Sequence, residues 1–490
     1  MALITVPALR ITTLNAAAIR GDADYVLYWM TSARRTRDNF ALDRAIEHAR
    51  RLARPLLVFE ALRVDYPWAS DRLHQFVLEG MEDNAARLAG AGITYLPWVE
   101  PSVGAGRGLL EALARRAAVV VTDEFPCFFL PKMIAAAAAR LEVRVEQVDT
   151  NGLMPLRAAP SEFPTAYAFR RFLHKNLASN LMDSPAADPL ADSADLGGAC
   201  VPEDVAPWTA MAGGPARLAQ LGSLPIRHDI AGVGVTGGEL AARERLDRFV
   251  ERRLGRYLED RNDPSVDGTS GLSPYLHFGH IGAHAIFDAL TRPLGWTPAL
   301  LATNGKGQRD GFWNLPPAVE SFMDEFVTWR EVGYSFCFHR PDYAEYSSLP
   351  NWARKTMDAH RGDRRPYLYS DAELAGAGTH DKIWNAAQRQ LVREGRIHNY
   401  LRMLWAKKIF EWSPSPDDAL NRLIELNNRY SLDGRNPNSY SGICWTLGRF
   451  DRAWGPVRPI FGTIRYMSSD NTARKLSLGT YLERYGVATR

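Results

Sequence analysis

Short runs of β-branched and apolar residues alternate with helical patterns over the first 150 residues, and this alternation constrains the fold more than any other feature. The runs are YVLYWM from Tyr25, PLLVFEAL from Pro55, ITYLPWV from Ile93, AVVVTDE from Ala118 and VRVEQVD from Val143. Between them lie segments rich in Ala, Leu and Arg with a helical period, such as ALDRAIEHARRLA from Ala41. Strands that alternate with helices predict a parallel sheet with crossover helices, so we expect a doubly wound α/β domain at residues 20–155.

A glycine-rich stretch, Gly104-Ala-Gly106-Arg-Gly108, follows the third of these runs and precedes a helical pattern. Backbone N–H groups at such a place can meet a phosphate, but the spacing is not that of the dinucleotide-binding motif G-x-G-x-x-G. The stretch therefore favours a turn that opens a helix over a dinucleotide site.

The composition changes within residues 156–238, where long stretches consist mainly of Ala, Pro, Gly, Asp and Ser. Such a segment is typical of a surface linker between domains. From Glu239 onward the strand signals nearly vanish, and helical patterns such as WNAAQRQLVREGRIHNYLRMLWAKKIFEW run toward the end of the chain. We therefore expect an all-helical second domain at residues 239–490.

Charge is distributed unevenly along the chain. Residues 381–490 hold 18 Lys and Arg against 10 Asp and Glu, a net charge of +8, while the whole chain carries only +3. A local excess of cations suits a polyanionic partner, which the total charge alone would not indicate.

The four cysteines lie far apart in the sequence, at Cys127, Cys200, Cys337 and Cys444. Because no C-x-x-C pair is present, the pattern favours neither a disulfide framework nor a zinc site, and we expect no metal and a reducing, cytoplasmic compartment. The sequence also has no run of about 18 apolar residues, so we expect no membrane span.

Two short segments of the helical part carry residue types suited to ligand chemistry. The segment DGTSGLSPYLHFG, from Asp267, places hydroxyls and flexible backbone before a helix, where they can bind phosphate or cap the helix. Glu325 and Trp329 stand four residues apart and share a helix face, where a carboxylate and a large ring can bind a nucleobase. A buried Trp beside a surface Glu is the alternative.

Three tryptophans, Trp384, Trp405 and Trp412, lie on helical patterns, the last two seven residues apart, or about 10 Å along a helix axis. Indoles at such separations can pass an electron in short hops. An aromatic seam of this kind is, however, more often plain core.

The C-terminal part interleaves cationic and aromatic side chains, at Trp445, Arg449, Arg452, Trp454 and Arg465. Basic residues among aromatic ones suit phosphate contact combined with base stacking. Arginines that cover a tryptophan-rich core are the alternative.

Several long motifs together resemble the photolyase/cryptochrome family, and within it the class II cyclobutane pyrimidine dimer photolyases. They are YWMTSARRTRDNFAL, GTSGLSPYLHFGHI, THDKIWNAAQ, RMLWAKKIFEW, NNRYSLDGRNPNSYSGICW and FGTIRYM, in family order and over nearly the whole chain apart from the linker. Trp329-Arg330-Glu331 and His398-Asn399 are instead similar to class I enzymes. The resemblance implies a Rossmann-like antenna domain followed by a helical domain that holds a U-shaped FAD.

The resemblance also implies which residues bind FAD. By match to the family's motifs, they are Tyr257, Thr269, Ser270, Leu272, Ser273, Arg402, Asn427 and Asp433. Arg402 and Asp433 are implied to form an ion pair beside the isoalloxazine, and Asn427 to face the flavin N5. The antenna pigment stays open, since deazaflavin, folate or another chromophore would suit the first domain.

The implied substrate is a pyrimidine dimer flipped out of UV-damaged DNA. Its pocket is implied to be lined by Glu325, Trp329, Asn399, Met403 and Trp445, with Arg449, Arg452, Trp454 and Arg465 as further DNA-binding residues. Trp384, Trp405 and Trp412 match the tryptophan triad that photoreduces the flavin in class II enzymes.

The resemblance implies a carbon–carbon lyase that repairs cyclobutane pyrimidine dimers with light. Reduced, anionic FAD gives an electron to the dimer when excited and takes it back after the dimer splits. The implied catalytic residues are Glu325 and Asn427 together with the three tryptophans, and we expect the protein to be a monomer. The alternative is a cryptochrome-type blue-light receptor with the same FAD and no repair; the pocket residues Glu325, Trp329 and Met403 favour repair. Specificity for 6-4 photoproducts stays open, because His398 adjoins the pocket residues in sequence.

Overall fold

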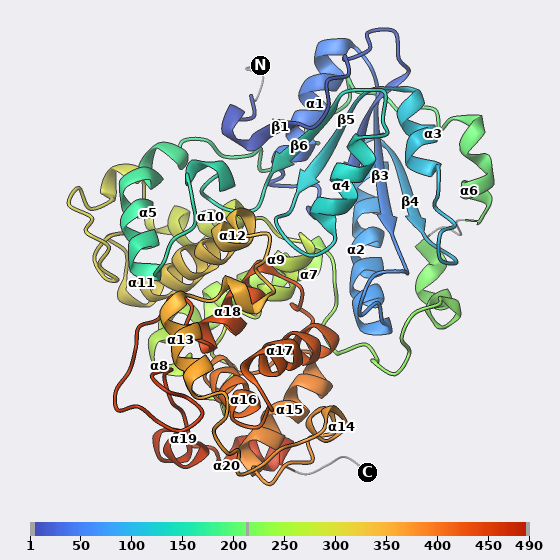
Figure 1. Ribbon diagram of the computed structural model, residues 1–490. Coiled ribbons are helices and arrows are strands. Elements are labelled where there is room, and N and C mark those ends of the chain that lie inside the picture. Colours follow the sequence, from blue (N-terminus) through green and yellow to red (C-terminus); the bar gives the residue numbers. More distant parts are fainter. Residues whose placement is uncertain (1–4, 212–214, 487–490) are drawn as a thin grey trace. The chain divides into compact units, whose positions relative to one another are not determined.

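The computed structural model describes residues 5–211 and 215–486 of the chain. It divides into two compact units, each assembled from separate stretches of sequence (Figure 1). Unit 1 comprises Met1–Pro160, Asn176–Arg248 and Gly271–Ala299, and unit 2 comprises Ser161–Lys175, Phe249–Ser270 and Leu300–Arg490. The chain therefore passes between the units several times.

Unit 1 is built around a six-stranded sheet in the order β1-β6-β5-β2-β3-β4. The strands are β1 (Ile11–Thr13), β2 (Tyr25–Met30), β3 (Leu56–Leu62), β4 (Thr94–Val99), β5 (Ala117–Glu124) and β6 (Val145–Asp149). Strands β2 to β6 pair in parallel. The chain runs outward from β2 to β4 and then returns to place β5 on the other side of β2, which is the doubly wound arrangement. Strand β1 was not predicted by the sequence pattern; it is three residues long and pairs antiparallel with β6.

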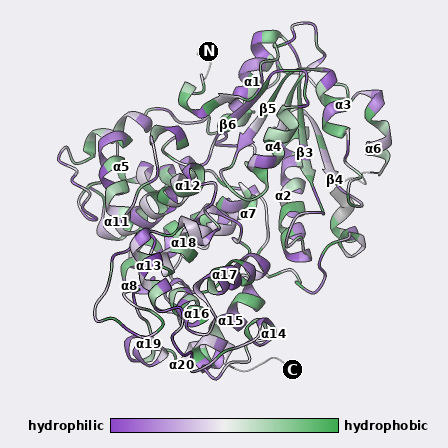
Figure 2. Cartoon of the chain, in the orientation of Figure 1, coloured by the Kyte–Doolittle hydropathy of each residue, from purple (hydrophilic) through white to green (hydrophobic). Residues whose placement is uncertain are grey.

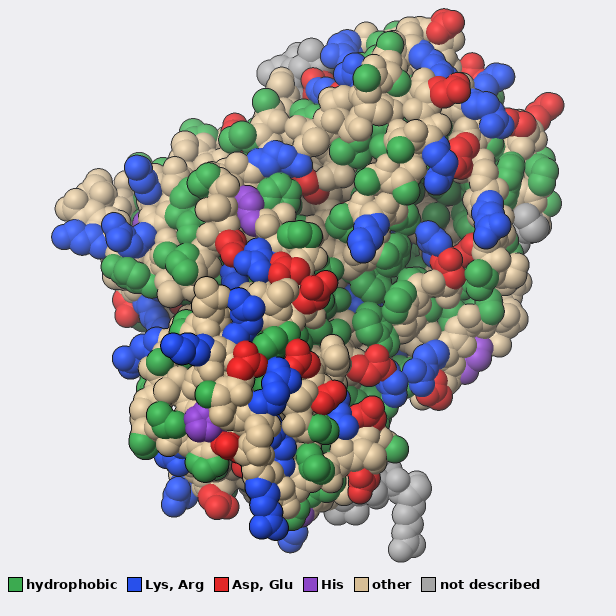
Figure 3. Space-filling view, viewed as in Figure 1, with side chains coloured by type: hydrophobic (Ala, Val, Ile, Leu, Met, Phe, Trp, Pro, Cys, Tyr) green, Lys and Arg blue, Asp and Glu red, His purple; other side chains and the backbone are tan. Residues whose placement is uncertain are grey.

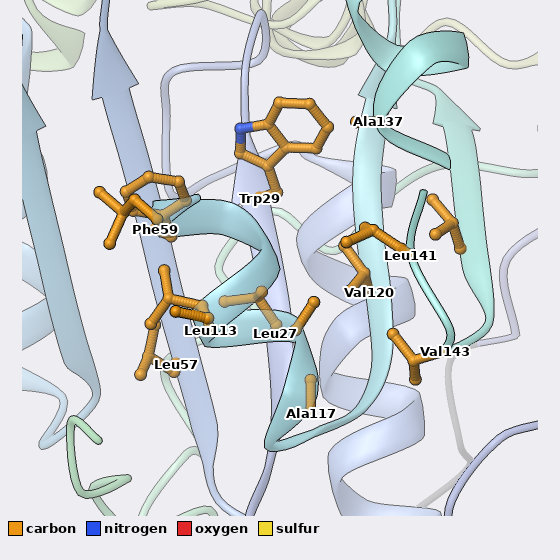
Figure 4. Close-up of a cluster of buried hydrophobic side chains, with 14 of the residues drawn as sticks. Leu27, Trp29, Leu57, Phe59, Leu113, Ala117, Val120, Ala137, Leu141 and Val143 are labelled. Atoms are coloured by element: carbon orange, nitrogen blue, oxygen red, sulfur yellow. The ribbon is translucent and has the colours of Figure 1, made fainter. Parts of the chain in front are cut away.

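Helices cover both faces of this sheet. Helices α1 (Phe40–Leu52) and α2 (Asp71–Gly90) pack on one face. Helices α3 (Leu109–Arg115) and α4 (Leu130–Ala138) pack on the other, over the cluster of buried side chains drawn in Figure 4. Every residue of β2 is buried, because this central strand meets helices on both sides, and its sequence is accordingly a continuous apolar run. The other helices of unit 1 are α6 (Ala206–Met211), α9 (Ser273–Phe278) and α10 (Ala283–Thr291).

The glycine-rich stretch forms the turn that opens α3. Gly108 precedes the helix with φ +85°, a left-handed conformation that glycine adopts without strain. The N–H of Gly104 donates to Glu100 Oε1 at 2.9 Å, and a Cβ at Gly106 would lie 2.8 Å from the ring of Trp98. These glycines therefore have roles in the turn and in close packing.

Unit 2 is helical, and within the described residues it contains no β-strand. Its helices are α8 (Tyr257–Asp260), α11 (Pro317–Met323), the π-helix η8 (Asp324–Trp329), α12 (Arg330–His339), α13 (Asn351–Ala359), α14 (Asp371–Ala375), α15 (Lys382–Glu394), α16 (Asn399–Glu411), α17 (Pro416–Tyr430), α18 (Pro437–Thr446), α19 (Ser469–Lys475) and α20 (Gly479–Tyr485). Helices α5 (Ala166–Asn180) and α7 (Glu239–Arg252) each contribute residues to both units.

The expected fold class, an α/β domain followed by a helical one, is confirmed. The strands of unit 1 are mostly hydrophobic, whereas the helices show hydrophobic and hydrophilic segments (Figure 2). No helix within residues 5–211 and 215–486 combines the length and apolarity that a membrane span requires. Residues 156–238, with the composition of a linker, include helices α5 and α6.

Candidate functional site

Arg402 and Asp433 form an ion pair in unit 2, with Arg402 Nη2 at 3.7 Å from Asp433 Oδ1. Arg402 lies in the first turn of α16, and Asp433 lies in the loop after α17. That loop is attached to the turn between α15 and α16, because the N–H of Leu432 donates to the carbonyl of Gly395 at 2.8 Å. Gly395, with φ +68°, ends α15 and reverses the chain toward α16. Three elements therefore converge to hold a guanidinium beside a carboxylate.

Asn427 is buried in the last turn of α17, close to the same loop. Its Nδ2 donates to Asn428 Oδ1 at 3.2 Å, and that oxygen also accepts the N–H of Arg435 at 2.8 Å. A Cβ at Gly434 would lie 3.0 Å from the carbonyl oxygen of Asn427, so a glycine is needed for the loop to pass this closely. The amide is thus held in a fixed position next to the loop that carries Asp433.

The hydroxyl-rich loop before α9 does not cap that helix through a side chain. Helix α9 begins at Ser273, and its N-cap residue is Leu272, which makes no side-chain cap hydrogen bond. Thr269 and Ser270 are half-buried and Ser273 is exposed, so these hydroxyls lie near the protein surface. The structure therefore shows no side-chain cap at the N-terminus of α9.

Tyr257 is buried among aromatic side chains of unit 2. Its ring packs edge-on against Phe249 and Phe322, with centroids 6.0 and 5.3 Å away. The guanidinium of Arg261 lies 5.2 Å from the centre of the same ring. Burial raises the pKa of the Tyr257 hydroxyl, which therefore stays protonated.

Glu325 and Trp329 both lie on the π-helix η8, between α11 and α12. Such π turns occur frequently at functional sites. The Glu325 carboxylate forms an ion pair with Arg261, whose Nη1 also donates to Ser321 Oγ at 3.0 Å. Both charged side chains remain partly exposed, at 35% and 20%, so a ligand can reach them. This pair places a fixed acceptor next to a large ring.

Asn399 and Met403 lie four residues apart in the first turns of α16 and therefore share one face of that helix. Asn399 is exposed, and Met403 is half-buried. His398 immediately precedes them. Burial lowers its pKa to about 4, so it is neutral near pH 7.

Trp384, Trp405 and Trp412 form a buried contact series. Each is at most 2% exposed. Trp384 touches both of the others: its Nε1 donates to the carbonyl of Trp405 at 3.0 Å, and its ring lies 5.4 Å from that of Trp412 at 70°. Asp381 caps α15 by accepting the N–H of Trp384 at 3.0 Å, which fixes this indole in the first turn.

The series continues through residues that the sequence patterns did not indicate. The ring of Tyr369 lies 5.2 Å from that of Trp412, and the ring of His380 lies 5.5 Å from it. The hydroxyl of Tyr369 donates to His380 Nδ1, and Tyr367, which is 47% exposed, stacks on His380 at 3.8 Å. Aromatic contacts thus extend from the buried tryptophans to the surface.

A second group of aromatic and cationic side chains lies near the surface of unit 2. The guanidinium of Arg465 stands 4.0 Å from the ring of Trp454 and 5.5 Å from that of Trp445. Arg452 lies 4.6 Å over Trp454. Asp451 accepts from Arg465 at 2.9 and 3.1 Å and from Trp454 Nε1 at 3.1 Å. The predicted interleaving of rings and cations is therefore present at four of the five positions.

Arg449 is the fifth position, and its placement differs from that of its neighbours. It is 5% exposed, forms an ion pair with Glu162, and donates through Nη1 to the carbonyl of Ser348 at 2.6 Å. Its guanidinium lies 4.4 Å over Phe336. These contacts favour the alternative interpretation for this residue, an arginine that covers an aromatic core.

Comparisons with known proteins agree with this geometry. The model of the DNA photolyase family matches residues 26–190. Over 480 residues the chain is 32% identical to the deoxyribodipyrimidine photo-lyase of Methanothermobacter thermautotrophicus, covering 97% of this chain and 98% of that relative. The chain belongs to the DNA photolyase family. The resemblance seen in the motifs is confirmed at this level.

Other photolyases are similar over most of the chain. The deoxyribodipyrimidine photo-lyase of Oryza sativa subsp. japonica is 34% identical over 93% of this chain and 86% of its own length. In fold, the chain is similar to a bacterial class III photolyase from Agrobacterium tumefaciens, with a TM-score of 0.68, 20% identity, and coverage of 96% of this chain and 87% of that structure. At that identity the likeness shows the fold alone.

The donor set of unit 2 fits the FAD of photolyases. An isoalloxazine presents alternating nitrogen and oxygen atoms along one edge, and a guanidinium, a carboxylate and a buried amide, at Arg402, Asp433 and Asn427, offer both donors and acceptors to such an edge. The hydroxyls of Thr269 and Ser270 suit the phosphates.

Sequence reasoning missed Arg261, the partner of Glu325. It lies just after α8 in a run of charged residues, Glu259-Asp260-Arg261, where the two acids next to it are equally plausible partners. Only the folded arrangement, which brings η8 back beside α8, selects it. No local pattern would have found Tyr369 and His380 either, since they contact Trp412 from a distant loop.

Proposed function

We propose that this chain is a DNA photolyase that uses light and reduced, anionic FAD to split cyclobutane pyrimidine dimers in UV-damaged DNA. One observation carries the proposal: helix α16 presents Arg402 of the ion pair, Met403 of the expected lesion pocket and Trp405 of the buried tryptophan series within four residues. Groups for cofactor, substrate and electron delivery are thereby fixed on one rigid element.

Splitting a pyrimidine dimer requires an electron that no side chain gives in its ground state, and bound FAD supplies it when excited by light. Arg402 provides a positive charge next to the proposed flavin site, and Asp433 holds that guanidinium in place. Asn427, rigidly placed by Asn428, offers an amide that can donate or accept.

Glu325 is proposed to bind the edge of the dimer. Its carboxylate pairs with Arg261 and offers acceptor oxygens, which suit an N–H group such as a pyrimidine presents. Trp329, on the same π-helix, offers a ring on which the flipped bases can stack. His398 is neutral near pH 7, so a protonated histidine is not part of the proposed chemistry.

The tryptophan series is proposed to reduce the flavin, in the order Trp405, Trp384 and Trp412 outward. The order follows from Trp384, which contacts the other two. Because all three indoles are shielded from water, an electron hole that moves along them is protected until it reaches the Tyr369 and His380 contacts. We propose that this series corresponds to the class II triad that the motifs resemble.

The proposal is tested by incubating the full chain with an oligonucleotide that carries a cyclobutane dimer, with reductant, in blue light and in darkness. We expect dimer loss only in light, with Glu325→Gln strongly reduced in rate. Loss that proceeds equally in darkness would contradict the proposal. No loss in light by chain that holds reduced FAD would contradict it as well, and would favour a blue-light receptor.

A further inference from the structure

The loop between η7 (Pro298–Leu300) and α11 packs directly on helix α5. The rings of Phe312 and His174 stack with centroids 3.6 Å apart, and the N–H of Gly307 donates to His174 Nδ1 at 3.2 Å. A Cβ at Gly305 would lie 2.8 Å from the Cβ of His174. Glycine in the loop is thus required for this close contact with α5.

The loop is held rigidly at its other end. The carboxylate of Glu320, in the first turn of α11, accepts backbone N–H groups of Gly311, Trp313 and Leu315. Asn314 Nδ2 donates to the carbonyl of Leu300 at 2.7 Å and so closes the base of the loop. Side chains that point outward from this loop are therefore presented from a fixed backbone.

His174 is neutral in this arrangement. Burial, and then the nearby charge of Arg170, lower its pKa to about 4. Near pH 7 its Nδ1 is consequently free to accept the N–H of Gly307, which is the contact observed. The positive charge of the region therefore comes from other residues.

Four exposed cations lie close to this contact in sequence: Arg171 and Lys175 on α5, on either side of His174, and Lys306 and Arg309 on the loop. Within the described part of the chain none of the four forms an ion pair, whereas the neighbouring Arg170 pairs with Asp324. Between Lys306 and the start of α11, the loop carries one carboxylate, that of Asp310. Lys and Arg side chains gather at the left edge of the face in Figure 3, where α5 and α11 lie in Figure 1. We call the four residues the α5 patch.

The α5 patch is tied to the element that carries Glu325. Arg170, next to Arg171 on α5, forms a bidentate pair with Asp324, at 2.8 and 3.1 Å. Asp324 immediately precedes Glu325 on η8. The position of the patch relative to the expected lesion pocket is therefore fixed within unit 2.

We propose that the α5 patch binds the phosphate backbone of DNA next to the damaged site. The inference rests on the proposed function and adds a contact surface separate from the aromatic group around Trp454. Unpaired, exposed cations on a rigid backbone are suited to phosphates, whose counterions they release. A protein partner would require an apolar centre in the patch. The four patch residues are all cationic, and Tyr167, the exposed ring beside them at 54%, is a single side chain.

The test compares the double variant Lys306→Ser/Arg309→Ser with a control of equal charge change. The control is Arg115→Ser/Arg140→Ser, two exposed arginines of unit 1 that are paired with Asp204 and Glu111. The affinity of the full chain for dimer-containing duplexes is measured by fluorescence anisotropy over a range of salt concentrations. One duplex is long, about 20 base pairs, and one covers little more than the lesion, about 8 base pairs.

On the long duplex we expect the patch variant to bind on the order of tenfold more weakly at low salt. The slope of log K against log salt concentration should be shallower by roughly 1.8, which corresponds to the loss of about two phosphate contacts. The short duplex and the control variant are expected to match the wild type. An unchanged slope for the patch variant on the long duplex would overturn the inference. So would a loss of equal size in the control, or one of equal size on the short duplex.

The two proposals fail in different ways. If wild-type chain does not split dimers in light, the repair function is wrong, whatever the salt slopes show. If it splits dimers but the patch variant binds the long duplex as the wild type does, only the inference about the α5 patch is wrong.

Discussion

Unit 2 contains two groups of tryptophans that differ in what surrounds them. Trp384, Trp405 and Trp412 are enclosed by protein, and the indole N–H groups of Trp384 and Trp405 are bonded to a carbonyl and to Gln388. Trp445 and Trp454 lie partly exposed, with guanidinium groups against their rings. Tryptophan thus lies among buried groups in the first set and against guanidinium groups in the second.

The surroundings of each indole, and not the spacing in sequence, separate the two roles. A buried indole cannot stack on a base but can exchange an electron with a ring it touches. A half-exposed indole that holds a guanidinium can present both a flat surface and a charge to DNA. If this comparison is correct, variants in the two groups should affect different measurements.

The largest effect is expected from Trp405→Phe. Flavin photoreduction should slow by about 100-fold or more, because phenylalanine is much harder to oxidise than indole. A factor of about 100 corresponds to ~2.7 kcal/mol of activation free energy. Repair by chemically reduced protein should be nearly unchanged. Transient absorption and a dimer-loss assay measure the two rates. If repair by pre-reduced protein collapsed while the melting temperature held, the relay role would be wrong.

A smaller effect, on DNA affinity and not on photoreduction, is expected from Trp454→Ala. Affinity for dimer-containing DNA should fall on the order of tenfold, since one base–ring stack contributes about 1–3 kcal/mol. Photoreduction should keep its wild-type rate. Trp454→Phe, which retains a ring, is the matched control and should recover most of the affinity. Equal losses in both variants would show that the indole ring is not a stacking surface.

The smallest functional effect is expected at Lys407, which joins the two groups. It lies two residues after Trp405, and its Nζ donates to the carbonyl of Thr446, next to Trp445. Burial lowers the pKa of Lys407 to about 7. In Lys407→Met, photoreduction and DNA affinity are expected to stay within about twofold of the wild type, or less than ~0.5 kcal/mol.

The stability of that variant should depend on pH. An unfolded lysine has a pKa of about 10.4, so the buried charge destabilises the fold at and below pH 7, and this penalty disappears as the pH rises toward 10. Lys407→Met should therefore gain in free energy of unfolding relative to the wild type near pH 6.5, by on the order of 4 kcal/mol, and lose most of that gain near pH 10. Urea unfolding at the two pH values measures this. A gain that is independent of pH would show that the fold does not lower the pKa of Lys407.

Much of the fold could be predicted from sequence because it depends on local periodicity. The run at Tyr25 becomes a central strand since it is apolar on both faces. Strand β1 could not be predicted, because three residues carry no periodicity and their pairing with β6 is a tertiary contact. Pro97 is tolerated in β4 because that strand lies at the edge of the sheet.

The site could be predicted where a motif was long and not where a single residue decided. The motifs named Arg402 and Asp433, which the fold brings together. Arg449 and Arg465 read alike in sequence, yet one pairs with Glu162 in the interior and the other lies between two rings. Which arginine is buried depends on the segment at Glu162, far away in the chain.

The central claim is that the helices of unit 2 around Arg402 and Asp433 hold FAD. It is tested most directly by denaturing the purified full chain, with Asp433→Ala and Arg115→Ser as comparison variants, and by identifying and counting the released chromophore. We expect FAD close to one molecule per chain from the wild type and from Arg115→Ser, and a small fraction of that from folded Asp433→Ala. Wild-type chain that releases no flavin after reconstitution, or Asp433→Ala/Arg402→Ala chain that retains it fully, would contradict the account.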